Sequence, residues 1–188
     1  MYVDAYERDL AYIHDRGFGA LARRSAPGLL QLFRQHRITE GRVVDLGCGS
    51  GIWAKELTDA GYQTLGVDIS PAMIEPARRR VPNTEFHVGS FIEFRVPPCR
   101  AITALGEVFN YLFDPKNSLR TLQQVFKRMF DSLTPTGLLV FDVAELGRCK
   151  CTQATVHRRG RLDLPGGFPS RRCQAAVDAP HRLLSQGW

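Results

Sequence analysis

Short apolar runs alternate along the chain with longer segments in which apolar residues recur at the spacing of an α-helix. The apolar runs predict five strands, at residues 43–46, 63–67, 84–88, 101–105 and 138–143. The last run is apolar up to Asp142, which is typical of a strand buried on both faces. Strands that alternate with helices predict an α/β fold, a Rossmann-like open and mostly parallel sheet of about five strands flanked by helices.

Helices are predicted before, between and after the first strands. Apolar residues recur at helical spacing over residues 2–16, and Ser25 followed by Pro27 predicts the cap and first turn of a second helix. Ser70 begins a further helix by the same logic, and Pro76 is expected to kink or shorten it.

A longer helix is predicted from residue 117 or 118 to about residue 133, where the segment 134–137 ends it with a proline and a glycine. One face of this helix is apolar and is expected to be buried. That face consists of Leu119, Leu122, Val125, Phe126 and Phe130.

Composition points to one hydrophobic core in a chain of 188 residues, of which 44% are hydrophobic and 23% charged. No apolar run approaches the length of a membrane span, and the first residues lack the pattern of a secretory signal. Five cysteines without a disulfide pattern favour reduced thiols and a cytoplasmic location.

The positive charge is concentrated near the C-terminus. The formal net charge is +6, but residues 1–149 carry 18 Lys and Arg against 17 Asp and Glu, and residues 150–188 carry 7 against 2. The charge therefore gives little support to nucleic-acid binding by the main part of the chain. Only seven Leu, Ile, Val and Phe residues lie between residues 151 and 188. Residues 148–188 are therefore predicted to form a basic, disordered tail.

A glycine-rich turn follows the first predicted strand. Gly47, Gly49 and Gly51 alternate with other residues directly after Asp45, and alternate glycines let a backbone turn sharply and approach a bound molecule. Asp68 ends the next strand, where a carboxylate can accept hydrogen bonds from ribose hydroxyls. The dinucleotide pattern would need a small residue at position 52, which is isoleucine, so the spacing disfavours a dinucleotide.

These residues resemble motif I and the following acid of the class I S-adenosylmethionine-dependent methyltransferases, over about residues 40–145. The resemblance implies that Gly47, Cys48, Gly49 and Gly51 lie against the cofactor and that Asp68 holds its ribose. It also implies that Asp45 orients the methionine amino group, although Asp45 could instead cap the loop's own N–H groups. The domain is predicted to span residues 41–147.

The resemblance extends to the adenine and acceptor sides of the site. Ile69 is expected to pack on the adenine, with Ser90 and Phe91 close to the adenine amine, although Ser90 could simply cap the next turn. Glu107, after the fourth strand, is a candidate base or amine-binding group, or an ordinary loop acid. His14 is a second candidate base, within a helical lid segment at residues 1–40, or a solvated side chain. No metal site is predicted.

The chain departs from the family after residue 144, where the final antiparallel strands of the sheet are expected and no strand pattern follows. A shifted reading frame and a lineage-specific basic tail both explain this change in composition, and both stay open.

The predicted function is methyl transfer from S-adenosylmethionine to a nitrogen or oxygen of a small molecule, because no Asn-Pro-Pro-Tyr/Phe motif of nucleic-acid methylation is present. Two alternatives remain. One is a non-catalytic cofactor-binding remnant, and the other is a nucleic-acid methyltransferase anchored by the basic tail. Neither a membrane nor a nucleic-acid partner is expected, and the sequence leaves the oligomeric state open.

Overall fold

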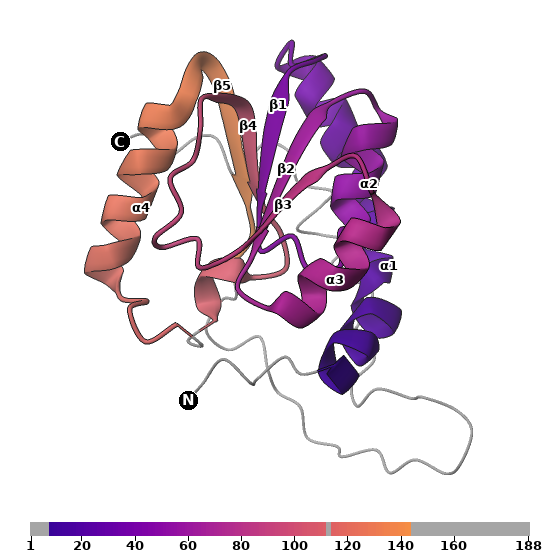
Figure 1. Cartoon of the computed structure of the whole chain (residues 1–188). Coiled ribbons are helices and arrows are strands. Elements are labelled where there is room, and N and C mark those ends of the chain that lie inside the picture. The colour runs from indigo at the N-terminus through magenta and orange to yellow at the C-terminus, as the bar shows by residue number, and fades with distance from the viewer. Residues whose placement is uncertain (1–7, 112–113, 144–188) are drawn as a thin grey trace, which may run out of the picture. The chain divides into compact units, whose positions relative to one another are not determined.

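Five parallel strands lie side by side in the order β3-β2-β1-β4-β5 (Figure 1). This computed structural model describes residues 8–111 and 114–143, except for some side chains in the first half of α1. The elements, in chain order, are α1 (Arg8–Gln35), β1 (Arg42–Leu46), α2 (Ile52–Asp59), β2 (Gln63–Asp68), α3 (Pro71–Arg80), β3 (Glu85–Val88), β4 (Cys99–Ala104), the 3-10 turn η2 (Val108–Asn110), α4 (Leu119–Ser132) and β5 (Leu133–Phe141). The α/β fold with a five-stranded parallel sheet is therefore confirmed.

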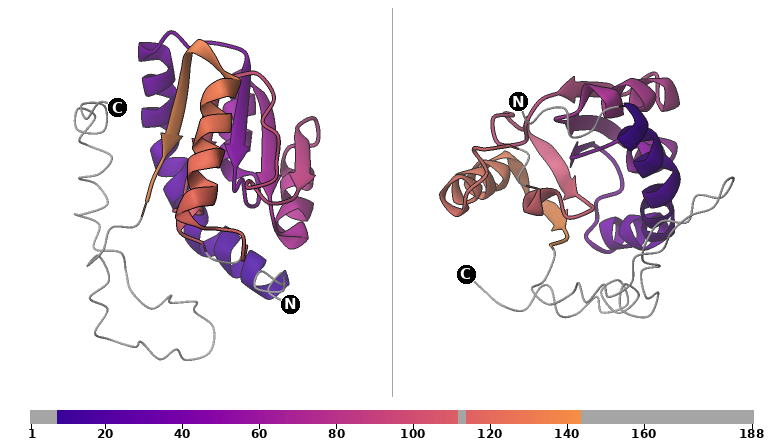
Figure 2. Two further views of the ribbon diagram at one scale, coloured as in Figure 1. Left: turned by 90° about the vertical axis from the view of Figure 1, so that its left-hand side faces the viewer. Right: turned by 90° about the horizontal axis from the view of Figure 1, so that it is seen from below.

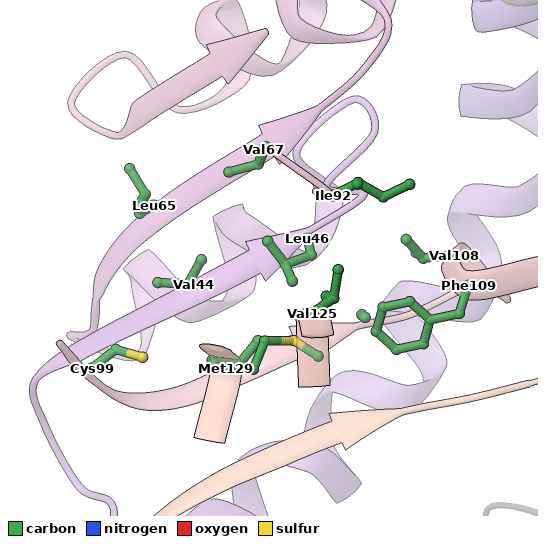
Figure 3. Packing of buried hydrophobic residues seen from close by; sticks show 12 residues of the cluster. Val44, Leu46, Leu65, Val67, Ile92, Cys99, Val108, Phe109, Val125 and Met129 are labelled. Carbon is green, nitrogen blue, oxygen red and sulfur yellow. The ribbon is translucent and has the colours of Figure 1, made fainter. Parts of the chain in front are cut away.

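Helices cover both faces of the sheet (Figure 2). On one face, Phe33 of α1 and Trp53 of α2 pack with Val43 of β1, all of them buried. On the other, Val125 and Met129 of α4 pack against side chains of β1 and β2 (Figure 3). Successive side chains of a strand point to opposite faces, so the burial of four consecutive residues of β1, from Val43 to Leu46, shows that this strand is covered on both sides.

Helix α1 is one continuous helix, so the prediction of two separate helices is wrong. Pro27 lies inside it, and Ser25 is a helical residue and not a cap. A proline removes one helical hydrogen bond. The apolar stripe of α1 nevertheless continues across Pro27. It packs in the core between α1, α2 and the sheet and consists of Ala22, Ala26, Leu29, Leu30 and Phe33. Burial of this stripe outweighs the lost bond.

Helix α3 also tolerates an internal proline. It begins after Ser70, whose hydroxyl accepts a hydrogen bond from the Met73 N–H, as its sequence predicts. It then continues through Pro76 to Arg80, so the expected shortening does not occur.

The buried face of α4 differs from the predicted one. Leu119 and Phe130 are 84% and 77% exposed, whereas Met129, outside the predicted face, is fully buried. The core-facing stripe comprises Leu122, Val125, Phe126 and Met129. The apolar face of α4 is therefore wider than the part of the helix that packs against the sheet.

Strand β5 begins directly after α4, and residues 134–137 lie within it and not in a separating turn. Its pairing with β4 jumps from Cys99 opposite Leu133 to Ala101 opposite Leu138, which places the extra residues in an irregularity of the strand. Proline is tolerated at such points. Every pairing in the described part of the chain is parallel, and the predicted tail at 148–188 lies outside it.

Candidate functional site

The strand order reverses between β1 and β4, and both strands end at the same edge of the sheet. In open α/β sheets this switch point is where ligands bind. The glycine turn after β1 and the turn at Gly106 and Glu107 after β4 both lie there. The fold therefore brings the predicted cofactor loop and one predicted catalytic residue to the same edge.

All three loop glycines adopt a left-handed backbone, with φ of 67° at Gly47, 53° at Gly49 and 75° at Gly51. Residues with a Cβ rarely adopt this conformation. Two of the positions are also crowded. A Cβ at Gly47 would lie 2.5 Å from Val108 Cγ2 of η2, and one at Gly51 would lie 3.1 Å from the Ala77 Cα of α3. Glycine is therefore needed for both the turn and its close packing.

Asp68 braces this loop from the end of β2. Its Oδ2 accepts a hydrogen bond of 2.8 Å from the Gly49 N–H, and its Oδ1 accepts one of 2.8 Å from the Ser70 N–H. Burial raises the pKa of the Asp68 carboxyl, and these two hydrogen bonds partly oppose the rise. Each carboxylate oxygen has a further lone pair. Asp68 can thus fix the loop and still accept hydrogen bonds from a diol.

Asp45 lies beneath the loop and is 3% exposed. Its Oδ1 accepts a hydrogen bond of 2.7 Å from the Thr103 hydroxyl, which in turn accepts one of 3.1 Å from the Trp53 indole N–H. Burial raises the pKa of Asp45 to about 7, and the charge of Asp68 adds to the rise, whereas the Thr103 hydrogen bond opposes it. Thr103 and Trp53 were not predicted as site residues, because only the paired strands bring them to Asp45.

Cys48 contributes backbone to the loop and a buried thiol to the core. Its N–H donates to the Val67 carbonyl at 3.0 Å, which extends the pairing of β1 with β2. Its side chain packs with Ile74 and Phe86. Burial raises the pKa of this thiol well above its usual range, and the charges of Asp45 and Asp68 raise it further, so the thiol is not activated as a nucleophile.

Ile69, Ser90 and Phe91 follow the carboxyl ends of β2 and β3, on the same edge of the sheet as the loop. The Ser90 hydroxyl accepts a hydrogen bond of 3.1 Å from the Ile92 N–H, so it does cap the next turn, and its own O–H is still available as a donor. Phe91 packs edge-to-face on Phe109, with ring centroids 5.4 Å apart. Their contacts with an adenine stay predictions.

Glu107 also adopts a left-handed backbone, with φ of 63°. The N–H groups of Gly106 and Glu107 both donate to Asp142 Oδ1, at 2.7 and 3.2 Å. Val108, the next residue, is the one that crowds Gly47. The turn that carries Glu107 is therefore in contact with the glycine loop on one side and held by the end of β5 on the other.

Helix α1 is tied to the glycine loop by one cluster of polar side chains. Asp15 of α1 accepts hydrogen bonds from the Ser50 hydroxyl and from the Arg80 guanidinium, the latter at 2.9 and 3.2 Å. Arg80 also donates to the Ser50 carbonyl. We call Asp15, Ser50 and Arg80 the α1 latch. His14 is the neighbour of Asp15 on α1, but its side chain lies outside the described part, so its role as a base stays a prediction.

We expect Asp15→Ala to lower the free energy of unfolding by about 1–2 kcal/mol, because the substitution leaves a partly buried guanidinium without its carboxylate. Urea denaturation measures the change. Asp59→Ala is the matched control, since Asp59 is paired with Lys55 one turn away on the exposed surface of α2. Such a pair contributes only about 0.3–0.5 kcal/mol. Equal losses of stability in the two variants would contradict a stabilising role for the α1 latch.

The described side chains include no cluster of three or more His, Cys, Asp or Glu suited to a metal ion. Among the helices in residues 8–111 and 114–143, none has the length and apolar character needed to cross a membrane.

Comparison with protein families gives a match over residues 43–137 to the family described as "Methyltransferase domain". A dTDP-3-amino-3,6-dideoxy-alpha-D-glucopyranose N,N-dimethyltransferase of Streptomyces fradiae is 30% identical over 140 residues, 73% of this chain and 54% of that protein. A ubiquinone biosynthesis O-methyltransferase of Methylocella silvestris is 32% identical over 143 residues, 73% and 49% of the two chains. The chain spans about half the length of the curated relatives it matches.

Solved structures show the same fold. The crystal structure of Streptomyces venezuelae DesVI aligns with a TM-score of 0.65 and 24% identity, over 79% of this chain and 62% of that one. The S-adenosylmethionine-bound structure of CalS10, an amino pentose methyltransferase from Micromonospora echinaspora, aligns with a TM-score of 0.60 and 24% identity, over 76% and 58% of the two chains.

Proposed function

Because this chain belongs to the family of class I S-adenosylmethionine-dependent methyltransferases, we propose that it transfers a methyl group from this cofactor to a nitrogen or oxygen of a small molecule. The observation that carries the proposal is the braced loop at the switch point of the sheet. Gly47, Gly49 and Gly51 turn there over Asp45, and Asp68 holds the loop from the next strand.

The residues at this edge fit the cofactor. In this proposal Asp68 offers its remaining lone pairs to the ribose diol, and the Asp45 carboxyl orients the methionine amino group; the two hydrogen bonds that hold Asp68 next to the loop support its role. The loop glycines let the backbone approach the ligand, which bulkier residues would obstruct. S-adenosylmethionine, when bound, supplies a methyl group on a sulfonium, which is already activated for transfer.

The acceptor side of the proposal rests on Glu107. When the lone pair of an amine or hydroxyl forms the new bond to the methyl carbon, the electrons of the carbon–sulfur bond pass to sulfur and the acceptor loses a proton. Glu107, in the turn after β4, is the proposed group that binds the acceptor or takes this proton. The dimethylated amino sugar named for the Streptomyces fradiae relative supports an amine acceptor. Correct alignment of the acceptor supplies much of the acceleration in such a transfer.

A small-molecule acceptor is favoured over nucleic acid, because the relatives that share most of this chain's domain are named for sugar and quinone chemistry. A cytoplasmic location belongs to the same proposal and is supported by the described cysteines, Cys48 and Cys99, which are both free thiols.

The proposed function requires that the chain binds the cofactor. Calorimetric titration of the purified chain with S-adenosylmethionine and S-adenosylhomocysteine tests this binding. We expect both to bind, and we expect Asp68→Ala to weaken binding by about 1–3 kcal/mol, because the variant loses both the ribose acceptor and the brace of Gly49. Glu85→Gln is the matched control, since this exposed acid pairs with His87 on the edge strand β3. A folded sample that binds neither compound would overturn the proposed function.

A further inference from the structure

Asp142, directly after β5, contacts both the end of β4 and the turn that carries Glu107. Its backbone N–H donates to the Ala104 carbonyl at the end of β4 at 3.4 Å. Its side-chain Oδ1 accepts hydrogen bonds from two consecutive N–H groups, those of Gly106 and Glu107, at 2.7 and 3.2 Å. One residue thus fastens both the end of β4 and the turn that follows it.

The turn held by Asp142 has an unfavourable backbone conformation. Gly106 and Glu107 have φ of 89° and 63°, and a left-handed conformation is costly for glutamate. The two hydrogen bonds to Asp142 compensate for this cost, since they satisfy two consecutive N–H groups of the turn. The Glu107 carbonyl then accepts a hydrogen bond of 2.8 Å from the Asn110 N–H, which closes η2.

The same turn positions Val108, which touches the cofactor loop, and Phe109, which packs against the end of β5. Val108 packs so closely on Gly47 that no Cβ would fit there. Phe109 packs on Phe141, the residue before Asp142, with ring centroids 5.5 Å apart. A second clamp closes the far end of η2, where the Asn117 side-chain amide donates to the Phe109 and Tyr111 carbonyls at 3.2 and 2.8 Å.

We propose that Asp142 is a positioning residue for methyl transfer: it holds the Gly106–Glu107 turn in its left-handed form and thereby sets Glu107 against the cofactor loop. The inference rests on the proposed function, because Glu107 is assigned there to the acceptor. Asp142 acts through its Oδ1 as a hydrogen-bond acceptor, and its charge strengthens both bonds. Asparagine at this position keeps an oxygen that can accept both hydrogen bonds.

The first test is amide hydrogen exchange, which needs no substrate. In Asp142→Ala, we expect the Gly106 and Glu107 amides to exchange roughly 10- to 100-fold faster, the factor that corresponds to losing a hydrogen bond to a charged group. In Asp142→Asn, we expect exchange within a few-fold of the parent. Unchanged exchange in Asp142→Ala, or equal acceleration in both variants, would overturn the inference.

A double-mutant cycle tests the role of the left-handed turn. Glu107→Gly removes the conformational cost at this position. In the parent chain, the loss of Asp142 lets the strained turn relax and recover part of that cost, so Asp142→Ala should shift the urea midpoint more in the Glu107→Gly background than in the parent chain. Equal shifts in the two backgrounds would show that Asp142 supports the fold without holding this turn, and would overturn the inference.

The kinetic test uses S-adenosylmethionine with dTDP-3-amino-3,6-dideoxy-α-D-glucose as the acceptor probe. We expect Asp142→Ala to lower kcat at least tenfold while the Kd of S-adenosylmethionine stays within about twofold, and Asp142→Asn to restore kcat. Loss of cofactor binding together with kcat would overturn the positioning role. If the parent chain transfers no methyl group to the probe, that result counts against the proposed acceptor, and the exchange and cycle experiments still decide the role of Asp142.

Discussion

Replacement of Gly51 by alanine is expected to lower the free energy of unfolding by roughly 2–5 kcal/mol. Gly51 has φ of 75°, which costs a residue with a Cβ about 1–2 kcal/mol. The added Cβ would also lie 3.0 Å from the Ala77 Cβ and 3.1 Å from its Cα. Ala77 is fully buried in α3, so the helix backbone has to move, and such overpacking costs about 1–3 kcal/mol.

Gly61→Ala separates these two costs. Gly61 is also left-handed, with φ of 91°, but a Cβ there meets nothing within 4 Å. We expect only the conformational penalty of about 1–2 kcal/mol in this control. Urea denaturation compares the two variants, and calorimetry should show weaker binding of S-adenosylmethionine to Gly51→Ala, because the loop is displaced. Equal losses of stability would mean that the loop and α3 are not in close contact.

The sequence predicted the elements whose signals are local. Capping by Ser70 and by Ser118 marks the starts of α3 and α4 within a single turn of helix. The apolar runs identify β1, β2 and β4 for a similar reason, since these strands are largely buried and burial on both faces requires apolar side chains at consecutive positions. Strand β5 was expected to be buried on both faces as well, but it is only partly buried, and Phe141 is 38% exposed. The glycine turn was predicted because a tight turn requires glycine at fixed positions. Asp68 was predicted with it because it stands at the end of the next apolar run.

Features that depend on tertiary contacts could not be predicted in this way. Pro27 is a strong local signal for a helix start, yet the core contacts on both sides of it keep α1 continuous. Phe130 has the same hydrophobicity as its buried neighbours, and only the extent of the sheet decides that it stays exposed.

The missed site residues share one property, which is distance along the chain. Thr103 reaches Asp45 across 58 positions, Asp142 reaches Gly106 across 36, and Arg80 reaches Asp15 across 65. Each of these contacts joins segments that only the fold brings together. A single sequence carries no signal of such pairs, because any of these residues alone is compatible with an exposed position.

The second large effect is a fall in stability as pH rises towards neutrality. The pKa of Asp45 is about 7 in the folded protein, chiefly because the carboxyl is buried, whereas an unfolded aspartate has a pKa of about 4. Between these values the folded state holds a proton that the unfolded state has released. By linkage, the free energy of unfolding falls as pH rises through this window, by up to about 4 kcal/mol in total.

Asp45→Asn isolates this contribution, because asparagine keeps an oxygen for the Thr103 hydroxyl but does not titrate. Burial also raises the pKa of Asp68, so the parent chain contains more than one group that destabilises the fold as it ionises. The informative quantity is therefore the difference between parent and variant in urea denaturation at pH 5 and pH 8. We expect Asp45→Asn to gain stability relative to the parent as pH rises, since only the parent then has to bury the Asp45 charge next to Asp68. A constant difference across this range would mean that Asp45 ionises normally, and hence that water reaches it beneath the glycine loop.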